Sequence, residues 1–256
     1  MEAEPVQAHH ARVELIAEQG SAASNQQLWL GLHFSLEKDW HIYWVNPGDS
    51  GLPPTLKWQL PAGFTAGEIQ WPRPEKLKRS TLADYGYQDD VVLLVPLRVP
   101  AGPGNGSHAD VGLQAKWLIC REVCIPDHAN LHLPLPAQSD PKTTAIFTEA
   151  RKHLPQPWPR SWKASAVSDK DDFVLFIQSG KPISTAEFYP LAAEQIENAT
   201  SQPVQATAQG AKITLKKSDQ LLQPIRVLKG LLVLGDGDAY MIQVPVTPAP
   251  KKAHNN

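Results

Sequence analysis

Residues 111–120 read VGLQAKWLIC, and the apolar residues of this stretch recur at every second position. The alternating apolar residues are Val111, Leu113, Ala115, Trp117 and Ile119. Because successive side chains of a β-strand point to opposite faces, the pattern is typical of a strand with one face on a hydrophobic core. Residues 28–36 and 131–135 repeat the alternation, and turn-forming clusters such as residues 46–51 (NPGDSG) separate such stretches. The first half of the chain is therefore predicted to form an antiparallel β-sandwich.

The second half of the chain repeats this character without cysteines. Residues 173–177 and 240–246 alternate, and residues 235–238 (GDGD) are predicted to form the hairpin turn between the last two strands. Between the halves, residues 141–153 favour one short helix, and a proline at every second position of residues 155–159 favours a stiff connector. The predicted organisation is all-β, with a first β-sandwich over 8–138, a linker over 139–161 and a second sandwich over 162–248.

Length and composition agree with this organisation and exclude some functions. The chain has 256 residues, which suits two sandwiches of about 100 residues each. Hydrophobic residues make up 42% of the chain, enough to build two cores. The net charge is −2 and the basic residues are spread along both halves, so a nucleic-acid partner is not expected.

The two ends of the sequence suggest an excerpt of a larger secreted protein. No stretch approaches the roughly 18 apolar residues of a membrane helix. The first residues (MEAEP) lack the apolar segment of a signal peptide, and the last (PAPKKAHNN) resemble a polar linker. We therefore expect a mature secreted segment that continues into further domains.

Cys120 and Cys124 are the two cysteines of the chain. On a straight strand they would lie about 13 Å apart, whereas a disulfide needs Cα atoms roughly 4.4 to 6.8 Å apart. If they bond, residues 121–123 must form a turn, a bulge or one turn of helix. The loop-entropy model gives such a small ring only about 2 kcal/mol of stabilisation. The spacing leaves two roles open, a structural staple or a redox-active pair.

Neighbouring residues are candidate modulators of the cysteine pKa values. Arg121 would lower the pKa of an adjacent thiol, and Glu122 would raise it. His128 is either a proton-transfer group or an ordinary surface histidine. Two other functions are open: an adhesion sandwich with a structural disulfide, and a copper-binding module in which Cys120, Cys124 and His128 are ligands. The chain has only two methionines, which disfavours copper.

Several separated motifs resemble one family. They are residues 117–126 (WLICREVCIP), 71–74 (WPRP), 85–89 (YGYQD) and 39–51 (DWHIYWVNPGDSG). Together they resemble the N-terminal periplasmic region of DsbD-type protein-disulfide reductases, and more closely the ScsB (suppressor of copper sensitivity) branch. The resemblance extends over roughly residues 10–250.

The resemblance implies a fold and a role. Two immunoglobulin-like β-sandwich domains would precede a membrane part of the same full-length protein, which would supply electrons. A periplasmic thioredoxin-fold protein, such as a disulfide isomerase, would receive them. Cys124 would form the mixed disulfide and Cys120 would resolve it. No diffusible cofactor and no metal are implied, because the electrons move between protein thiols.

The resemblance also implies a loop that caps the cysteines with aromatic side chains. Tyr85 and Tyr87 lie on the segment that matches this loop. An ordinary hairpin whose aromatic side chains cover the edge of the core is the alternative interpretation of the same two residues.

Overall fold

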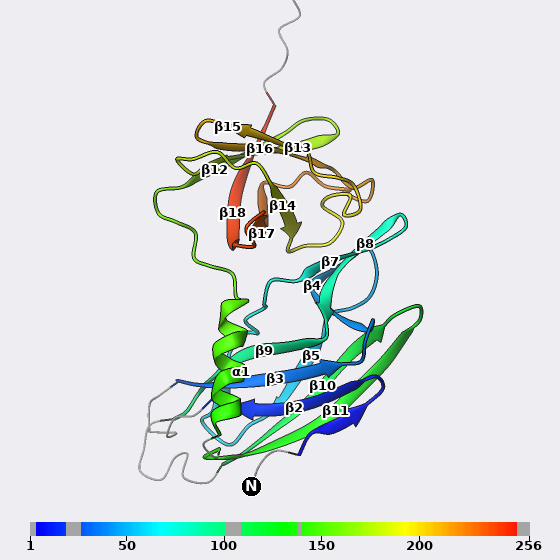
Figure 1. Ribbon diagram of the computed structural model, residues 1–256, viewed down its shortest axis with the longest axis vertical. Coiled ribbons are helices and arrows are strands. Elements are labelled where there is room, and N and C mark those ends of the chain that lie inside the picture. The colour runs from blue at the N-terminus through cyan, green and yellow to red at the C-terminus, as the bar shows by residue number, and fades with distance from the viewer. Residues whose placement is uncertain (1–3, 19–26, 101–108, 138–139, 250–256) are drawn as a thin grey trace, which may run out of the picture. The chain divides into compact units, whose positions relative to one another are not determined.

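The computed structural model describes residues 4–18, 27–100, 109–137 and 140–249 (Figure 1). The chain divides into two compact units. The first unit comprises Met1–Pro47, Gly51–Leu77 and Tyr85–Leu154, and the second comprises Gly48–Ser50, Lys78–Asp84 and Pro155–Asn256. The change of unit at residue 154 falls inside the predicted linker, whereas the predicted boundary between residues 138 and 139 lies outside the described residues.

The first unit is built on two sheets. Its strands are β1 (Val6–Ala8), β2 (Ala11–Ala17), β3 (Gln27–Leu36), β4 (His41–Gly48), β5 (Thr55–Gln59), β6 (Thr65–Ala66), β7 (Glu75–Arg79), β8 (Leu82–Gln88), β9 (Asp90–Arg98), β10 (Ala109–Cys120) and β11 (Cys124–Leu135). One sheet has the order β1-β2-β3-β9-β6. The other has the order β11-β10-β4-β8-β7, with β5 also pairing with β10. The last residues of β7 and the first of β8 are grouped with the second unit.

The alternation seen in the sequence places the core between these two sheets. On β10, Val111, Ala115 and Ile119 are fully buried, as are alternate residues of β2 and β3. Phe34 of β3 and Trp117 of β10 meet edge to face with ring centroids 5.1 Å apart, so the two sheets pack directly on each other. Removal of these apolar faces from water is the main source of stability of the sandwich.

The helix α1 (Pro141–Lys152) belongs to the first unit, which corrects its predicted place in the linker. Asp140 caps its start by accepting a hydrogen bond from the backbone N–H of Lys142 at 3.0 Å. Phe147 and Ala150 are buried against Val92 and Leu94 of β9. The helix lies against this strand (Figure 1). The weak apolar stripe of this segment therefore covers the outer face of a sheet instead of linking two domains.

The second unit is also a sandwich. Its strands are β12 (Lys163–Ser168), β13 (Asp172–Gln178), β14 (Ala186–Pro190), β15 (Val204–Thr207), β16 (Gly210–Lys216), β17 (Val227–Leu234) and β18 (Ala239–Pro248), in the order β14-β17-β18-β12-β13-β16-β15. Its core contains the residues predicted to alternate, such as Phe173, Leu175 and Ile242. The predicted turn joins β17 to β18, and the Leu234 N–H donates to the Asp238 carbonyl at 2.8 Å. The predicted fold class, two immunoglobulin-like β-sandwiches, is confirmed.

Candidate functional site: the disulfide at the end of the β10–β11 hairpin

The two cysteines close a β-hairpin in the first unit. The register of β10 and β11 pairs Cys120 directly with Cys124, so residues 121–123 form the loop between them. The Cα atoms lie 4.2 Å apart and the sulfur atoms 2.06 Å apart, which is a disulfide bond. Inside the loop, the Arg121 N–H donates to the Val123 carbonyl at 3.1 Å. The turn that the sequence required for a bond is therefore a hairpin loop.

The two sulfur-bearing residues differ sharply in exposure. Cys120 is fully buried, whereas Cys124 is exposed to solvent. The preceding residue, Val123, has 63% of its surface exposed, which is unusual for a large apolar side chain. Because thiol–disulfide exchange needs direct access to the attacked sulfur, an incoming thiolate can reach the Cys124 side of the bond and not the Cys120 side.

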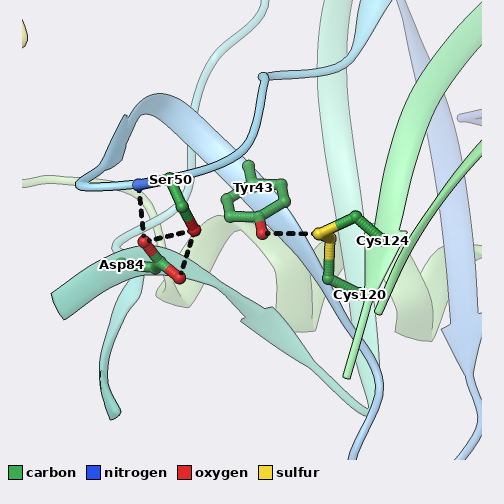
Figure 2. Close-up of a disulfide and its surroundings, with 5 residues drawn as sticks. All are labelled: Tyr43, Ser50, Asp84, Cys120 and Cys124. Carbon is green, nitrogen blue, oxygen red and sulfur yellow. Dashed lines mark hydrogen bonds between the residues drawn. A yellow bond between two sulfur atoms is a disulfide. The ribbon is translucent and has the colours of Figure 1, made fainter. Parts of the chain in front are cut away.

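Tyr43 of β4 is the polar neighbour of the exposed cysteine. Its hydroxyl lies 3.6 Å from the Sγ of Cys124 (Figure 2). The ring of Tyr43 is buried, and the backbone of Gly51 lies against it. A Cβ atom added to Gly51 would lie 2.1 Å from the Cζ atom of Tyr43, and Gly51 has a φ of +82°. Glycine at position 51 thus lets the loop after β4 close over the ring.

His41, on the same strand, is the neighbour of the buried cysteine. It is the direct cross-strand partner of Cys120 in the sheet and is itself buried. Its ring meets that of Tyr43 edge to face, with centroids 5.1 Å apart. The sequence analysis did not assign a role to His41 or Tyr43. Their one signal was the segment 39–51, which carries both and contributed to the family resemblance.

The predicted cap residues lie in the core. Tyr85 and Tyr87 both belong to β8 and are buried. The ring of Tyr85 meets that of Trp44 at 6.0 Å, and the hydroxyl of Tyr87 donates to the Pro72 carbonyl at 2.9 Å. Burial raises the pKa of Tyr87 well above its ordinary value. These positions match the core alternative of the sequence analysis, and the ring beside the disulfide is that of Tyr43.

The three candidate modulators of the cysteine pKa values, Arg121, Glu122 and His128, lie in different surroundings. The Arg121 guanidinium lies 5.2 Å from the ring centroid of Trp40, whose ring also stacks on His10 at 3.8 Å. Glu122 is exposed. His128 pairs with Lys116, four residues along β11 from Cys124, which is a distance of about 13 Å on a strand. This distance disfavours proton transfer by His128 at the sulfurs, and its exposed side chain fits the alternative of an ordinary surface histidine.

The same spacing argues against the alternative of a copper-binding module. With both cysteines in a disulfide and His128 distant, the three residues do not converge on one point. In the part of the chain that the structure describes, there is also no group of three or more His, Cys, Asp or Glu side chains that could hold a metal ion.

A hydrogen-bonded loop anchor lies in the small segments grouped with the second unit. The Ser50 hydroxyl donates one bifurcated hydrogen bond to the two carboxylate oxygens of Asp84, at 2.9 and 3.0 Å, and the Ser50 N–H donates to Asp84 Oδ1 at 2.9 Å (Figure 2). Burial raises the pKa of Asp84, and the bonds from Ser50 offset part of this rise. These bonds join two short segments of the second unit, Gly48–Ser50 and Lys78–Asp84.

The hairpin strand β11 is also anchored to the turn between β1 and β2. Asp127 accepts a hydrogen bond from the His9 N–H at 2.8 Å, and its Oδ2 lies 3.1 Å from the ring Nδ1 of His9. Partial burial by itself would raise the pKa of Asp127. Hydrogen bonds from the N–H groups of His9 and His128, together with the His9 ring, outweigh this effect and lower that pKa.

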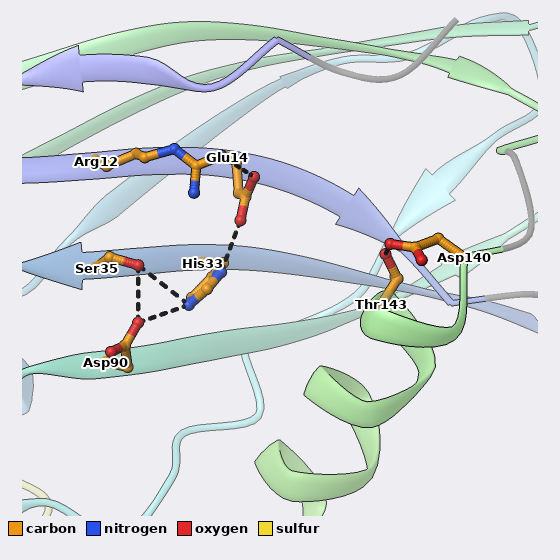
Figure 3. A network of polar contacts seen from close by, with 7 residues as sticks. All are labelled: Arg12, Glu14, His33, Ser35, Asp90, Asp140 and Thr143. Carbon is orange, nitrogen blue, oxygen red and sulfur yellow. Dashed lines mark hydrogen bonds and ion pairs between the residues drawn. The ribbon is translucent and has the colours of Figure 1, made fainter.

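A second polar cluster lies on the outer face of β2, β3 and β9 (Figure 3). His33 is placed between two carboxylates, with Nδ1 2.8 Å from Glu14 and Nε2 3.0 Å from Asp90. The hydroxyl of Ser35 donates to the same Asp90 oxygen at 2.7 Å. The cluster borders a cavity of about 340 Å³ beside α1. The strands that carry the cluster belong to a different sheet from the strands that carry the disulfide, and we assign the cluster a structural role.

Comparisons with known proteins identify a family and a similar solved structure. The family described as "Thiol:disulfide interchange protein DsbD, N-terminal" matches residues 12–136. The crystal structure of the N-terminal periplasmic domain of ScsB from Proteus mirabilis is similar in fold, with a TM-score of 0.72 and 17% sequence identity. The similarity covers 93% of this chain and 93% of that chain. No curated protein matches the sequence. Among the described residues, no helix is long and apolar enough to cross a membrane.

Proposed function

The chain belongs, through residues 12–136, to the family of the DsbD N-terminal region, and on that premise we propose that it reduces the disulfide of a thioredoxin-fold partner in the periplasm. A membrane-embedded domain of the same full-length protein would return the electrons to the Cys120–Cys124 pair. In this proposal the pair itself is the redox group, and no diffusible cofactor takes part.

The difference in exposure between the two cysteines is the observation that carries the proposal. In the reduced protein, the exposed Cys124 thiolate attacks one sulfur of the partner disulfide, and the other partner sulfur leaves as a thiolate. The buried Cys120 then attacks Cys124 Sγ, the Cys120–Cys124 bond forms, and the first partner sulfur leaves. Two electrons pass to the partner, which takes up two protons from water. One accessible and one shielded sulfur suit this order of attack.

A purely structural disulfide is the second candidate, and the packing disfavours it. A ring closed over five residues contributes only about 2 kcal/mol by the loop-entropy model. The hairpin that carries the bond already has a continuous register of cross-strand pairs from Ala109 to Cys120, and its inner face is buried. A staple at the end of such a hairpin adds little to its stability.

The reduction potential of the pair tests the proposal. The protein is equilibrated in graded dithiothreitol or glutathione buffers, and free thiols are counted by alkylation and mass spectrometry. Exchange-active pairs have potentials of about −120 to −270 mV, whereas structural bonds lie below about −300 mV. A value in the upper range, with a mixed disulfide trapped through Cys124 in Cys120→Ala, is the expected result. A pair that stays oxidised below the lower limit would leave the structural candidate as the better account.

A further inference from the structure

We propose that His41 is the proton acceptor and donor for Cys120, the buried cysteine of the pair. The inference rests on the proposed function and deepens it, because it assigns a residue to the second chemical step. Three neighbouring strands carry the relevant side chains. In the sheet, Cys120 has Cys124 as its partner on one side and His41 as its partner on the other.

The register places the imidazole beside the buried sulfur. Side chains of directly paired residues on antiparallel strands project from the same face of the sheet, with Cβ atoms about 4.5 to 5.5 Å apart. Cys124, Cys120 and His41 therefore form a row across β11, β10 and β4. The row runs from an exposed residue to two buried ones.

The buried position of Cys120 disfavours the thiolate, which is the reactive form of the residue. The thiolate is the nucleophile in disulfide exchange, and apolar surroundings disfavour it by raising the pKa of a thiol. A neutral imidazole beside the thiol can take its proton, and the resulting imidazolium then stabilises the thiolate. Histidine–cysteine pairs of this kind titrate as a coupled unit.

Other titratable groups around His41 have different placements. Those on its own strand and on the neighbouring strands and loop are Tyr43, Asp84, Tyr85, Tyr87, Asp110, Lys116, Arg121, Glu122 and Cys124, of which Asp110 and Lys116 lie farther back along β10 from Cys120. Tyr43 has its hydroxyl at Cys124, Tyr87 bonds to a backbone carbonyl, and Arg121 stacks over Trp40. Each sulfur thus has its own polar neighbour on β4, with Tyr43 beside Cys124 and His41 beside Cys120.

The step balances as follows. In the mixed disulfide, His41 takes the proton of the Cys120 thiol. The Cys120 thiolate attacks Cys124 Sγ, the Cys120–Cys124 bond forms, and the bond from Cys124 to the partner sulfur breaks. The partner sulfur leaves with the electron pair, and His41 releases its proton to water. During re-reduction, an incoming thiolate attacks Cys124 and His41 returns a proton to the departing Cys120.

The test separates the two chemical steps in time. The reduced protein is mixed with the small disulfide 5,5′-dithiobis(2-nitrobenzoic acid) in a stopped-flow instrument. The first thionitrobenzoate is released by attack of Cys124, at a rate that depends on reagent concentration. The second is released by the intramolecular attack of Cys120, at a rate independent of concentration. General-base catalysis contributes about 10²- to 10⁴-fold. We expect His41→Gln to slow the second phase about 10²-fold, leaving the first phase unchanged.

Two control variants sharpen this test. Tyr43→Phe removes the hydroxyl beside Cys124 and is expected to alter the first phase only. His132→Gln removes an exposed histidine far along β11 and is expected to alter neither phase. Equal second-phase rates and equal pH profiles in the wild type and in folded His41→Gln would overturn the inference while leaving the proposed function intact. A wild-type pair that releases no thionitrobenzoate would instead contradict the proposed function.

A measurement on the wild-type chain covers the case in which His41→Gln does not fold. The imidazole of His41 is titrated by NMR in the oxidised protein, in the reduced protein and in Cys120→Ser. We expect its titration to shift between the oxidised and reduced states, and Cys120→Ser to abolish that shift. An identical titration in all three forms would overturn the inference.

Discussion

Replacing Gly51 by alanine should damage the disulfide site through one added methyl group. The new Cβ atom would lie 2.1 Å from Tyr43 Cζ, whereas an ordinary contact begins at 3.4 Å, so the ring or the loop must move by about 1.3 Å. The left-handed backbone at Gly51 adds strain of about 1–2 kcal/mol for an L-residue. Overpacking against a buried ring typically costs about 1–3 kcal/mol. We therefore expect Gly51→Ala to lower the free energy of unfolding by about 2–5 kcal/mol.

Urea unfolding followed by tryptophan fluorescence measures this loss. Six of the eight tryptophans lie before residue 154, so the signal comes mainly from the first unit. The matched control is Gly180→Ala in the second unit, because Gly180 has a similar φ of +78° and its added Cβ atom would meet nothing within 4 Å. The unfolding of that unit is followed through Trp158 and Trp162. The backbone strain alone should lower the free energy of unfolding of that variant by about 1–2 kcal/mol.

A double-mutant cycle identifies the clash itself. In a Tyr43→Ala background the added methyl group has no ring to meet, so Gly51→Ala should lose only the stability that its backbone strain costs. The expected coupling energy between the two positions is about 1–3 kcal/mol. If Gly51→Ala and Gly180→Ala lose the same stability, or if the cycle shows no coupling, then the loop does not depend on Gly51 to cover Tyr43.

Three further predictions concern stability. Phe147→Ala should lower the free energy of unfolding of the first unit by about 3–5 kcal/mol, because this fully buried ring fixes α1 to β9. A loss below about 1 kcal/mol in urea unfolding would contradict the packing of α1 on the first unit. Replacing both cysteines by alanine should cost only about 2 kcal/mol, and global unfolding on chemical reduction of the wild type would contradict this. Asp84 and Asp127 should give opposite pH dependences. The raised pKa of Asp84 contributes stability that is complete below the unfolded value of 3.8 and is lost as pH rises through the folded value. The lowered pKa of Asp127 contributes stability that is present above 3.8 and is lost as pH falls through the folded value. Each Asn variant should lose the contribution of its carboxyl group to the pH dependence of stability, and the two lost contributions should have opposite signs. Thermal unfolding of Asp84→Asn and Asp127→Asn measured against pH checks this, and the same change of pH dependence in both variants would refute the assignment.

Local patterns in the sequence predicted most of the fold. Alternating apolar residues on β3, β10, β13 and β18 identified strands and their buried faces, because the side-chain period of a strand is visible within a few residues. The cysteine pair was identified for the same reason, since both members and their loop lie within five residues of the chain. The helix was also predicted, but its partner was not. Nothing within α1 indicates that Phe147 packs on β9.

The rest of the site depends on contacts between distant parts of the chain. Tyr43 and His41 are about eighty residues from the cysteines, and only the pairing of β4 with β10 brings them together. That pairing is a single bridge at the end of β10, with no sequence signature of its own. Tyr85 and Tyr87 were candidates for the cap because their segment matched a family motif. Their side chains are buried in β8, a placement set by the tertiary packing of the sheet.

The long register of the β10–β11 hairpin has a consequence for the reduced protein. Eleven consecutive cross-strand pairs lead up to the Cys120–Cys124 pair, so cleavage of the sulfur–sulfur bond leaves the scaffold around the two thiols in place. The two thiols then have a very high effective molarity toward each other, because the folded hairpin already holds them side by side. The chain can alternate between its two oxidation states with little reorganisation. In the proposed exchange reaction, a mixed disulfide with a partner would therefore be short-lived, because the hairpin already holds the second thiol beside the first.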